Sequence, residues 1–424
     1  MGKIKKLFEK KRVRIVSFLI LFFAIGFLFL PDRGQSPVYS LQYFSGIDYI
    51  KIGKGWFFDA SLINDFKNIH GWGIYLYKFK SIHPDVIPYS INNTGLVYIT
   101  WLLSKIFFFI GPIGALLLGQ IILHILITIY TAEKVLTKNS RLLFYFFYGV
   151  NPIVIKMVVF PYYYFWAFIP SLVFIIISEK SSFKPNIFFQ FLIAILLVIA
   201  FGTRSTVIFT ILLIFLFILI QKRIKFFIPL IVSFVLIFFL YNKYFSFSKN
   251  YHPWHTAYIG LGAYPNPYGI KIASDDEGTD YFYSVTGKQL SNSIKGNYYD
   301  ENNLKEYNKV LKGRDFYILK SNPYIFIRNG ILNYLQSFTF GTIVNRGYYI
   351  NYLLSLIGFM VLIFFVFKKE FWGILAISST TLSFCLFYPP IIAYMFGGIF
   401  FVAFYLAKHV PDLFRSRLLQ QNNV

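Results

Sequence analysis

Residues 13–30 read VRIVSFLILFFAIGFLFL, an apolar run of 18 residues whose one charged side chain is Arg14. A helix needs about 20 apolar residues to cross the hydrocarbon core of a bilayer, so this run is nearly long enough to span it. A basic tail precedes the run and no small-residue cleavage site follows it, which favours an uncleaved anchor over a removable signal. The run therefore predicts a first membrane-spanning helix.

Similar apolar runs recur along the 424 residues, of which 57% are hydrophobic, 22% aromatic and 14% charged. A water-soluble domain cannot bury so much apolar surface. The runs are continuous rather than alternating, which favours helices over a barrel. The sequence thus predicts an all-α polytopic membrane protein with about ten transmembrane helices, at 13–30, 112–131, 142–159, 162–178, 187–203, 206–221, 225–241, 350–367, 372–388 and 391–407.

The net charge of +23 indicates how the chain is oriented. A basic soluble protein would suggest nucleic acid as a partner, but membrane proteins collect Lys and Arg in their cytoplasmic loops, so we expect none. Every short basic connection, including 131–141, falls on one side if the apolar segment 94–111 lies at the outer surface as an interfacial or re-entrant helix. We therefore expect both termini in the cytoplasm, in a bacterial-type inner (plasma) membrane. The single cysteine, Cys385, allows no internal disulfide.

Two long polar segments, 31–93 and 242–349, are then expected on the outer side. Long segments in a compact protein usually carry function, and these are rich in Tyr, Asn and Gly. The expected organisation is a bundle at 1–241, which includes the first outer loop 31–93 and the helix at 94–111. The second outer segment, 242–349, forms a cap, and 350–424 holds the last helices and a cytoplasmic tail.

Of the 18 acidic residues, 13 lie in these two outer segments and none lies in the middle of a predicted span. This distribution argues against a proton-coupled transporter, which usually needs an ionisable group at membrane depth. Asp48 lies among apolar and aromatic neighbours in SLQYFSGIDYIKIGKGW, where partial desolvation suits a general base. An ordinary helix-capping aspartate is the alternative. Asp59 is the next candidate for the base, ahead of Asp275 and Asp276.

The layout resembles the C-type fold of membrane glycosyltransferases, which use polyprenyl- or dolichyl-phosphate-linked sugars as donors. Gly46-Ile47-Asp48-Tyr49-Ile50 is similar to the family's acidic motif in the first outer loop, although Tyr49 stands where a second acid is usual. NNTGLVYITWLLSKIFFFIG at 92–111 resembles the near-surface helix, with Asn93-Thr94-Gly95 in place of prolines. SNPYIFIRNGILNYLQSF at 321–338 resembles the late outer-loop helix, and the Trp-Trp-Asp-type motif of oligosaccharyltransferases is missing.

The resemblance implies a hexosyl- or pentosyltransferase that moves a sugar from a polyprenyl-phosphate donor to a glycan or glycolipid acceptor on the outer face. Polysaccharide or lipopolysaccharide biosynthesis would be its setting. Inversion at the anomeric carbon is expected, because a phosphate leaves without needing a proton. One alternative is an O-antigen-type oligosaccharide polymerase or ligase, which usually lacks a long first loop. Another is a non-enzymatic flippase or transporter, which needs polar groups inside the bundle.

A lipid phosphate must be held by a cation as its charge grows. Arg204, in IAFGTRSTV between the apolar runs 187–203 and 206–221, is the first candidate, followed by Arg328 and Arg346. The planar fork of an arginine matches phosphate geometry. Arginines that extend to lipid headgroups are the alternative.

Residues 251–280, YHPWHTAYIGLGAYPNPYGIKIASDDEGTD, collect histidines and acids and are open to three interpretations. An acceptor-sugar platform would use His252, Trp254 and His255 for stacking and Asp275 and Asp276 for hydrogen bonds. A divalent-cation site for Mg²⁺ or Mn²⁺ would use His252, His255 and Asp276. A purely structural cap with solvated acids is the third interpretation. No other cofactor is implied.

Overall fold

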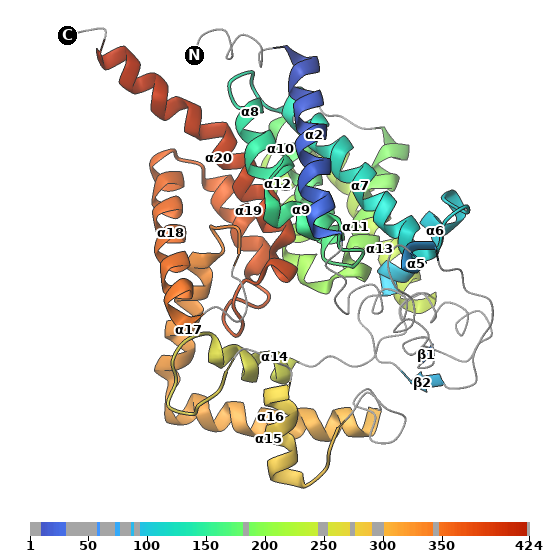
Figure 1. Cartoon of the computed structure of the whole chain (residues 1–424), viewed down its shortest axis with the longest axis vertical. Helices are drawn as coiled ribbons and strands as arrows, with labels where there is room; N and C mark the ends of the chain where they lie inside the picture. The colour runs from blue at the N-terminus through green and yellow to red at the C-terminus, as the bar shows by residue number, and fades with distance from the viewer. Residues whose placement is uncertain are drawn as a thin grey trace.

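The computed structural model describes residues 10–30, 57–59, 73–76, 86–88, 94–180, 186–244, 253–271, 276–290, 301–341 and 347–421. Long helices form a bundle, and a smaller group of helices lies across one of its ends (Figure 1). The bundle contains α2 (Lys11–Phe29), α7 (Pro112–Tyr130), α8 (Arg141–Phe144), α9 (Pro152–Val158), α10 (Ile169–Glu179), α11 (Ile187–Thr203), α12 (Ile208–Ile220), α13 (Ile224–Tyr244), α18 (Gly347–Phe367), α19 (Phe371–Thr381) and α20 (Ile392–Gln421). The helical class predicted from the sequence is therefore confirmed.

Four helical segments within the described ranges are long and apolar enough to cross a membrane: Lys11–Phe29, Pro112–Val135, Ile224–Tyr244 and Gly347–Phe367. In three of them only 22% of the most apolar window is buried, so the remaining apolar side chains point out of the protein. Such continuous exposed apolar surface is typical of contact with lipid. The other apolar helices of the bundle are shorter, for example Ile187–Thr203.

A fifth span is formed if the pair Arg141–Gly149 and Pro152–Val158 is counted as one, although the two halves are bent by 58°. The sequence causes this break. The side chain of Asn151 accepts a hydrogen bond from the Ile153 N–H at 2.9 Å, and Pro152 occupies the first turn of α9. An Asn cap followed by Pro starts a new helix rather than continuing the old one.

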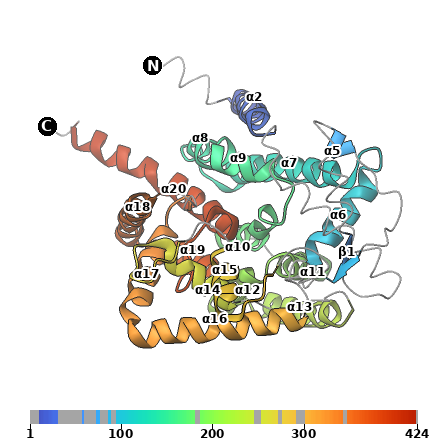
Figure 2. The ribbon, with the colours of Figure 1, turned by 60° about the horizontal axis from the view of Figure 1, so that its bottom comes forward.

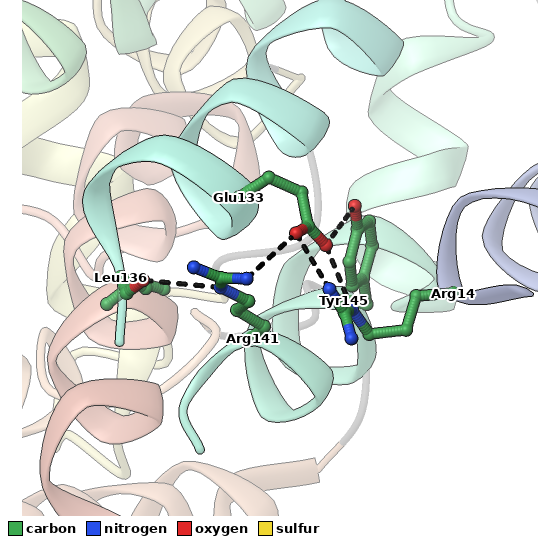
Figure 3. A network of polar contacts seen from close by, with 5 residues as sticks. All are labelled: Arg14, Glu133, Leu136, Arg141 and Tyr145. Carbon is green, nitrogen blue, oxygen red and sulfur yellow. Dashed lines mark hydrogen bonds and ion pairs between the residues drawn. The ribbon is translucent and has the colours of Figure 1, made fainter. Parts of the chain in front are cut away.

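The polar connections at one end of the bundle are held together by buried ion pairs (Figure 3). Arg14, near the start of α2, donates to both carboxylate oxygens of Glu133 at 2.9 and 2.8 Å. Arg141 at the start of α8 reaches the same carboxylate at 3.2 Å, and the Tyr145 hydroxyl donates to it at 3.3 Å. The bidentate geometry and the extra donors offset the desolvation of the buried charges.

A second ion cluster lies at the same end. Lys408 of α20 contacts Glu179 at 2.7 Å and Glu370 at 3.2 Å. The neighbouring Lys180 donates to the Tyr130 hydroxyl at 2.7 Å, which ties the end of α10 to the end of α7. We call this region the charged end, defined by Arg14, Glu133, Arg141, Glu179, Glu370 and Lys408. The short basic connections of the sequence, as far as the structure describes them, thus gather at one end of the bundle.

The opposite end carries a cap made of α14 (Pro253–Gly260), α15 (Asp276–Thr286), α16 (Glu301–Ser321) and α17 (Pro323–Gln336). Figure 2 shows α16 running across this end of the bundle. The cap has a hydrophobic core of its own, which includes Tyr258, Phe282, Leu311 and Tyr388. The helix predicted within 321–338 is confirmed as α17.

The first long segment is described only in part. Strands β1 (Phe57–Asp59) and β2 (Val86–Pro88) form an antiparallel pair, so the fold is helical apart from this short ladder. Helix α5 (Gly73–Leu76) contacts α7, because Gly111 donates to the Tyr75 carbonyl at 3.0 Å. Helix α6 (Thr94–Ile106) lies within the predicted near-surface helix. A side chain at Gly95 would come within 2.5 Å of the Thr203 backbone, so glycine allows α6 to touch the end of α11.

Candidate functional site

Arg204 lies at the end of α11, on the side of the bundle that adjoins the cap. The helix ends there because Arg204 adopts an extended backbone conformation, with φ −152° and ψ 106°. Its guanidinium carbon lies 4.0 Å from the centre of the Tyr394 ring and 5.0 Å from that of Tyr163. We call Tyr163, Arg204 and Tyr394 the tyrosine end. Lys408 of the charged end is about four turns along α20 from Tyr394, roughly 20 Å away.

One tyrosine ring comes from the connection between α9 and α10, and the other comes from the start of α20. Tyr163 belongs to the run FPYYYFW at 160–166, where Tyr162 and Tyr163 have ring centres 4.2 Å apart. Tyr394 lies in the first turn of α20 and contacts Phe384 and Tyr388 at 5.4 and 5.3 Å between ring centres. Those two residues belong to the core of the cap. Arg204 therefore lies where the bundle and the cap meet.

The guanidinium of Arg204 has hydrogen-bonding capacity to spare. Its Nε is buried, and within the described residues no hydrogen bond or ion pair engages this side chain. Aromatic faces stabilise a guanidinium by roughly 0.5–2 kcal/mol without using its N–H groups. The residue is partly exposed, so an anion can reach it. The arrangement suits a phosphate or carboxylate, which accepts the donors that the tyrosine rings leave unused.

The other predicted arginines differ from Arg204. Arg328 on α17 donates to the Pro265 carbonyl at 2.9 Å and from Nε to Asn329 Oδ1 at 3.1 Å, so part of its guanidinium fastens the cap. Arg346 lies outside the described residues. The structure thus distinguishes the arginines by whether their donors are already used, which the sequence could not do.

Two of the predicted acceptor residues lie on α14 and pack against α16. The Trp254 and Phe316 rings have centres 5.4 Å apart, with the Lys312 ammonium 5.7 Å from the indole. His255 Nδ1 lies 2.6 Å from the Tyr307 hydroxyl. These contacts bind α14 to α16, and the platform remains a prediction.

The acids of the site are described unevenly. Asp276 begins α15 and is exposed, whereas His252 and Asp275 lie outside the described residues. Among the residues that the structure describes, no group of three or more His, Cys, Asp or Glu side chains is placed to hold a metal ion. Asp59 ends strand β1 opposite Val86, and Asp48 lies outside the described ranges. The choice of Asp48 as the base therefore stays a prediction.

Asp315, a buried carboxylate in the cap, is not among the site residues predicted from the sequence. It is 3% exposed, and neither carboxylate oxygen has a hydrogen-bond partner among the described residues. Burial raises the pKa of Asp315 to about 8. Burial also raises the pKa of Tyr258 on the facing helix α14 to about 12, with smaller contributions in the same direction from Glu277 and Asp315. A signal was present in the sequence, because Asp315 occupies a core position in the apolar stripe of Leu304, Leu311 and Ile318.

A polar stripe inside the bundle was also missed. Gln120, His124, Thr128 and Thr131 recur along one face of α7 and the turn after it, and all four are fully buried. Gln120 donates to the Val158 carbonyl at 2.9 Å, and the His124 Nε2 lies 3.1 Å from the Gly149 carbonyl. These contacts give hydrogen-bond partners to carbonyl groups that have no helical N–H partner because the span is broken. These four polar residues are three or four positions apart in the sequence, a spacing that places them on one face of a helix and that could have predicted the stripe.

Comparison with known proteins identifies no relative: no protein-family model matches the chain, and no curated protein and no solved structure is significantly similar to it.

Proposed function

We propose that this protein is a membrane glycosyltransferase that binds a polyprenyl-phosphate sugar donor at the tyrosine end. The observation that carries the proposal is Arg204, a guanidinium held by Tyr163 and Tyr394 whose donors have no partner within the described residues. The buried Nε of this partly exposed side chain has no acceptor within the described residues, and a ligand phosphate would supply one. The apolar outward faces of the neighbouring helices offer a path for the prenyl chain.

In the proposed reaction an acceptor hydroxyl attacks the anomeric carbon of the donor sugar. The new bond joins the acceptor oxygen to that carbon, and the bond between the carbon and the phosphate oxygen breaks. The polyprenyl phosphate leaves with the electron pair, which Arg204 stabilises. The proton of the acceptor hydroxyl passes to a carboxylate, for which Asp48 is the proposed base. The product is inverted at the anomeric carbon.

We also propose ten membrane spans, with the charged end in the cytoplasm and the cap on the outer side. The gathering of the short basic connections at the charged end supports this orientation, because such connections stay on the cytoplasmic side. A Lys138→Cys variant tests it in intact cells with a membrane-impermeant thiol reagent. We expect labelling only after the cells are opened. Ready labelling of intact cells would reverse the orientation or change the span count.

Binding of undecaprenyl phosphate to the purified protein tests the donor site directly. Arg204→Gln should weaken binding about 30-fold or more, because losing one partner of a buried charge-assisted contact costs on the order of 2–5 kcal/mol. Arg223→Gln is the matched control, because Arg223 lies in the connection between α12 and α13 and donates to the Ile177 carbonyl at 3.3 Å. Equal binding by the wild type and Arg204→Gln would remove Arg204 from the site.

The transfer step is tested separately with Asp48→Asn. Incubation of the purified protein with polyprenyl-phosphate sugars and a glycolipid acceptor should transfer the sugar to the acceptor and release polyprenyl phosphate, detected by mass spectrometry. The amide keeps the shape of the side chain but cannot accept the proton, so release should fall about 100-fold or more. Undecaprenyl phosphate binding should stay unchanged. Release within a few-fold of wild type would move the role of base to Asp59 first and to Asp275 or Asp276 next.

A lipid-linked sugar transporter is the second candidate, and the polar stripe of α7 favours it. Gln120 Oε1, His124 Nδ1 and Thr128 Oγ1 are buried and have no partner within the described residues. Polar groups inside a bundle often mark a path for substrate. Proteoliposomes separate the two functions. Movement of a lipid-linked sugar across the bilayer without release of polyprenyl phosphate supports the transporter, and release supports the transferase.

A further inference from the structure

A groove of about 510 Å³ lies between α15 and α16 on the outside of the cap, apart from the tyrosine end. Its lining includes Tyr281 of α15 and Glu306, Lys309, Arg314 and Tyr317 of α16. Its volume lies within the range of pockets that hold small ligands, roughly 300–1,000 Å³. Tyr317 is 58% exposed, so one aromatic ring is presented to solvent beside two cations.

Arg314 is held in this groove in the same way that Arg204 is held at the tyrosine end. Its guanidinium carbon lies 5.3 Å from the centre of the Tyr281 ring, 5.4 Å from that of Tyr268 and 5.5 Å from that of Tyr317. Its Nε is buried without a hydrogen-bond partner, and no ion pair within the described part of the chain engages it. Three rings fix the direction of the guanidinium while its donors remain unused.

The charge balance of the groove is positive. Glu306 is the acid of its lining, and both of its carboxylate oxygens lie 2.8 Å from the Lys288 ammonium. Arg314 and Lys309 are therefore not neutralised by it. Asp315 does not compensate them either, because consecutive residues of a helix point in different directions and Asp315 is buried toward the core of the cap. The lining therefore carries an excess of positive charge, which an anionic occupant would complement.

Gly313 keeps the groove open. It lies in the interior of α16, where glycine is less stable than alanine. A side chain at this position would meet no atom within 4 Å, so packing does not require glycine here. Any larger residue would instead extend into the space that the groove and its neighbouring hollow share.

We infer that this groove binds an anionic saccharide, a glycan that carries carboxylate or phosphate groups. The planar fork of Arg314 matches a carboxylate or phosphate, and the Tyr281 and Tyr317 rings suit the apolar face of a sugar. The groove would hold part of the acceptor if the protein is the proposed glycosyltransferase, and this acceptor role rests on that function. The binding of the anionic saccharide to the groove does not depend on the proposed function.

Binding of two oligosaccharides of similar size to the full-length protein in nanodiscs tests the inference. Oligogalacturonate is the anionic probe and maltohexaose is the neutral one. Oligogalacturonate should bind and maltohexaose should bind at least about 10-fold more weakly.

Arg314→Gln should lower oligogalacturonate affinity about 10-fold or more, and Arg314→Lys should lower it nearly as much, because lysine lacks the bidentate fork. Lys312→Gln is the matched control, because Lys312 lies on the same helix over Trp254. Its affinity should change less than about 2-fold.

Gly313→Leu gives a second test that does not depend on charge. The open space at this position accommodates leucine, so the thermal midpoint should not fall, while oligogalacturonate binding should be lost. Equal binding of both oligosaccharides, or full binding by both Arg314→Gln and Gly313→Leu, would overturn the inference. Binding only to vesicles that contain phosphatidylglycerol would also overturn it and would assign the cations to lipid headgroups.

The readouts of the groove and of the donor site are independent. Arg204→Gln should leave oligogalacturonate binding unchanged, and Arg314→Gln should leave undecaprenyl phosphate binding unchanged. Retained saccharide binding in a protein that binds no undecaprenyl phosphate would contradict the proposed function alone. Retained undecaprenyl phosphate binding in a protein that binds no oligogalacturonate would contradict the groove alone.

Discussion

The charged end and the tyrosine end of the bundle bury charge in opposite ways. At the charged end Glu133 receives donors from Arg14, Arg141 and Tyr145, so the buried charges compensate each other. At the tyrosine end Arg204 is surrounded by aromatic rings, and no carboxylate within the described residues pairs with it. In the adjoining cap Asp315 is buried, and its carboxylate has no hydrogen-bond partner among the residues that the structure describes.

This difference separates charges that hold the fold from charges that are available to a ligand. A buried ion pair with good geometry roughly offsets its own desolvation, and removing one partner leaves the other uncompensated. An unpaired buried charge makes the folded protein less stable than a neutral residue would. Its presence therefore indicates a role other than stability. The two ends should respond differently to mutation.

The largest expected effect is at the charged end. Glu133→Ala leaves the buried Arg14 and the partly exposed Arg141 without their shared anion, which should lower the free energy of unfolding by about 3–5 kcal/mol. Thermal or denaturant unfolding in detergent measures it. Lys138→Ala, an exposed replacement in the same connection, should change stability by less than about 0.5 kcal/mol. A loss below about 1 kcal/mol for Glu133→Ala would mean that this network does not hold the bundle together.

The next effect concerns Asp315 and depends on pH. Its pKa is about 8 in the folded protein, against an ordinary aspartate pKa of 3.8, so between these values the folded state holds a proton that the unfolded state has lost. The free energy of unfolding should then fall by about 1.4 kcal/mol for each unit that pH rises from about 5 to about 7, or roughly 3 kcal/mol over that range. Asp315→Asn should remove this slope. Asp280→Asn, which alters an exposed aspartate of α15, should leave it in place.

If Asp315→Asn and the wild type show the same dependence of the thermal midpoint on pH, the carboxylate has a partner under those conditions. Measurements between pH 5 and pH 7 on the intact protein are sufficient, because the expected slope is steepest there. Such a result would mean that Asp315, like Glu133, is a buried acid whose charge is compensated by a partner.

The smallest expected effect is the change in the free energy of unfolding that Arg204→Met causes. Methionine fills a similar apolar space, and replacing an unpaired buried charge by a hydrophobic residue is neutral or stabilising. We expect the free energy of unfolding to stay equal or to rise by up to about 1 kcal/mol. A loss above about 2 kcal/mol would show that Arg204 supports the fold, and the contrast between the two ends would not hold.

Much of the fold could be predicted from the sequence, because the lengths of the apolar runs and the positions of the charged residues between them are local properties of the chain. The apolar runs predicted helices, and α2, α7, α13 and α18 occupy the predicted positions. The basic connections predicted one common side, and Lys180, Lys408 and Arg141 lie together at the charged end. The bend between Gly149 and Pro152 was not predicted, because a run of hydrophobic residues does not reveal which carbonyl groups will find a partner on α7.

The candidate site was predicted less well. Arg204 was chosen from its place between two apolar runs, and its tyrosine partners lie far from it in the sequence. Trp254 and His255 were chosen for a binding surface, and in the structure they contact Phe316 and Tyr307 of α16. Asp315 was passed over because an acid in a polar helix looks like any solvated residue until the packing of that helix is known.

Run length and charge placement along the chain already predict that this protein is helical, that its apolar runs suit a bilayer, and that its charges are segregated. These properties follow from the lengths of the runs and the counts of residues within them, which do not depend on what each run touches. Only the tertiary structure decided which charges are neutralised. Glu133 pairs with Arg14 from a helix 119 positions earlier in the chain, whereas the Arg204 guanidinium lies over tyrosine rings and pairs with no carboxylate of the described ranges. Whether a buried charge has a partner depends on distances of a few ångströms between segments remote in sequence, and the packing of the folded chain alone sets those distances.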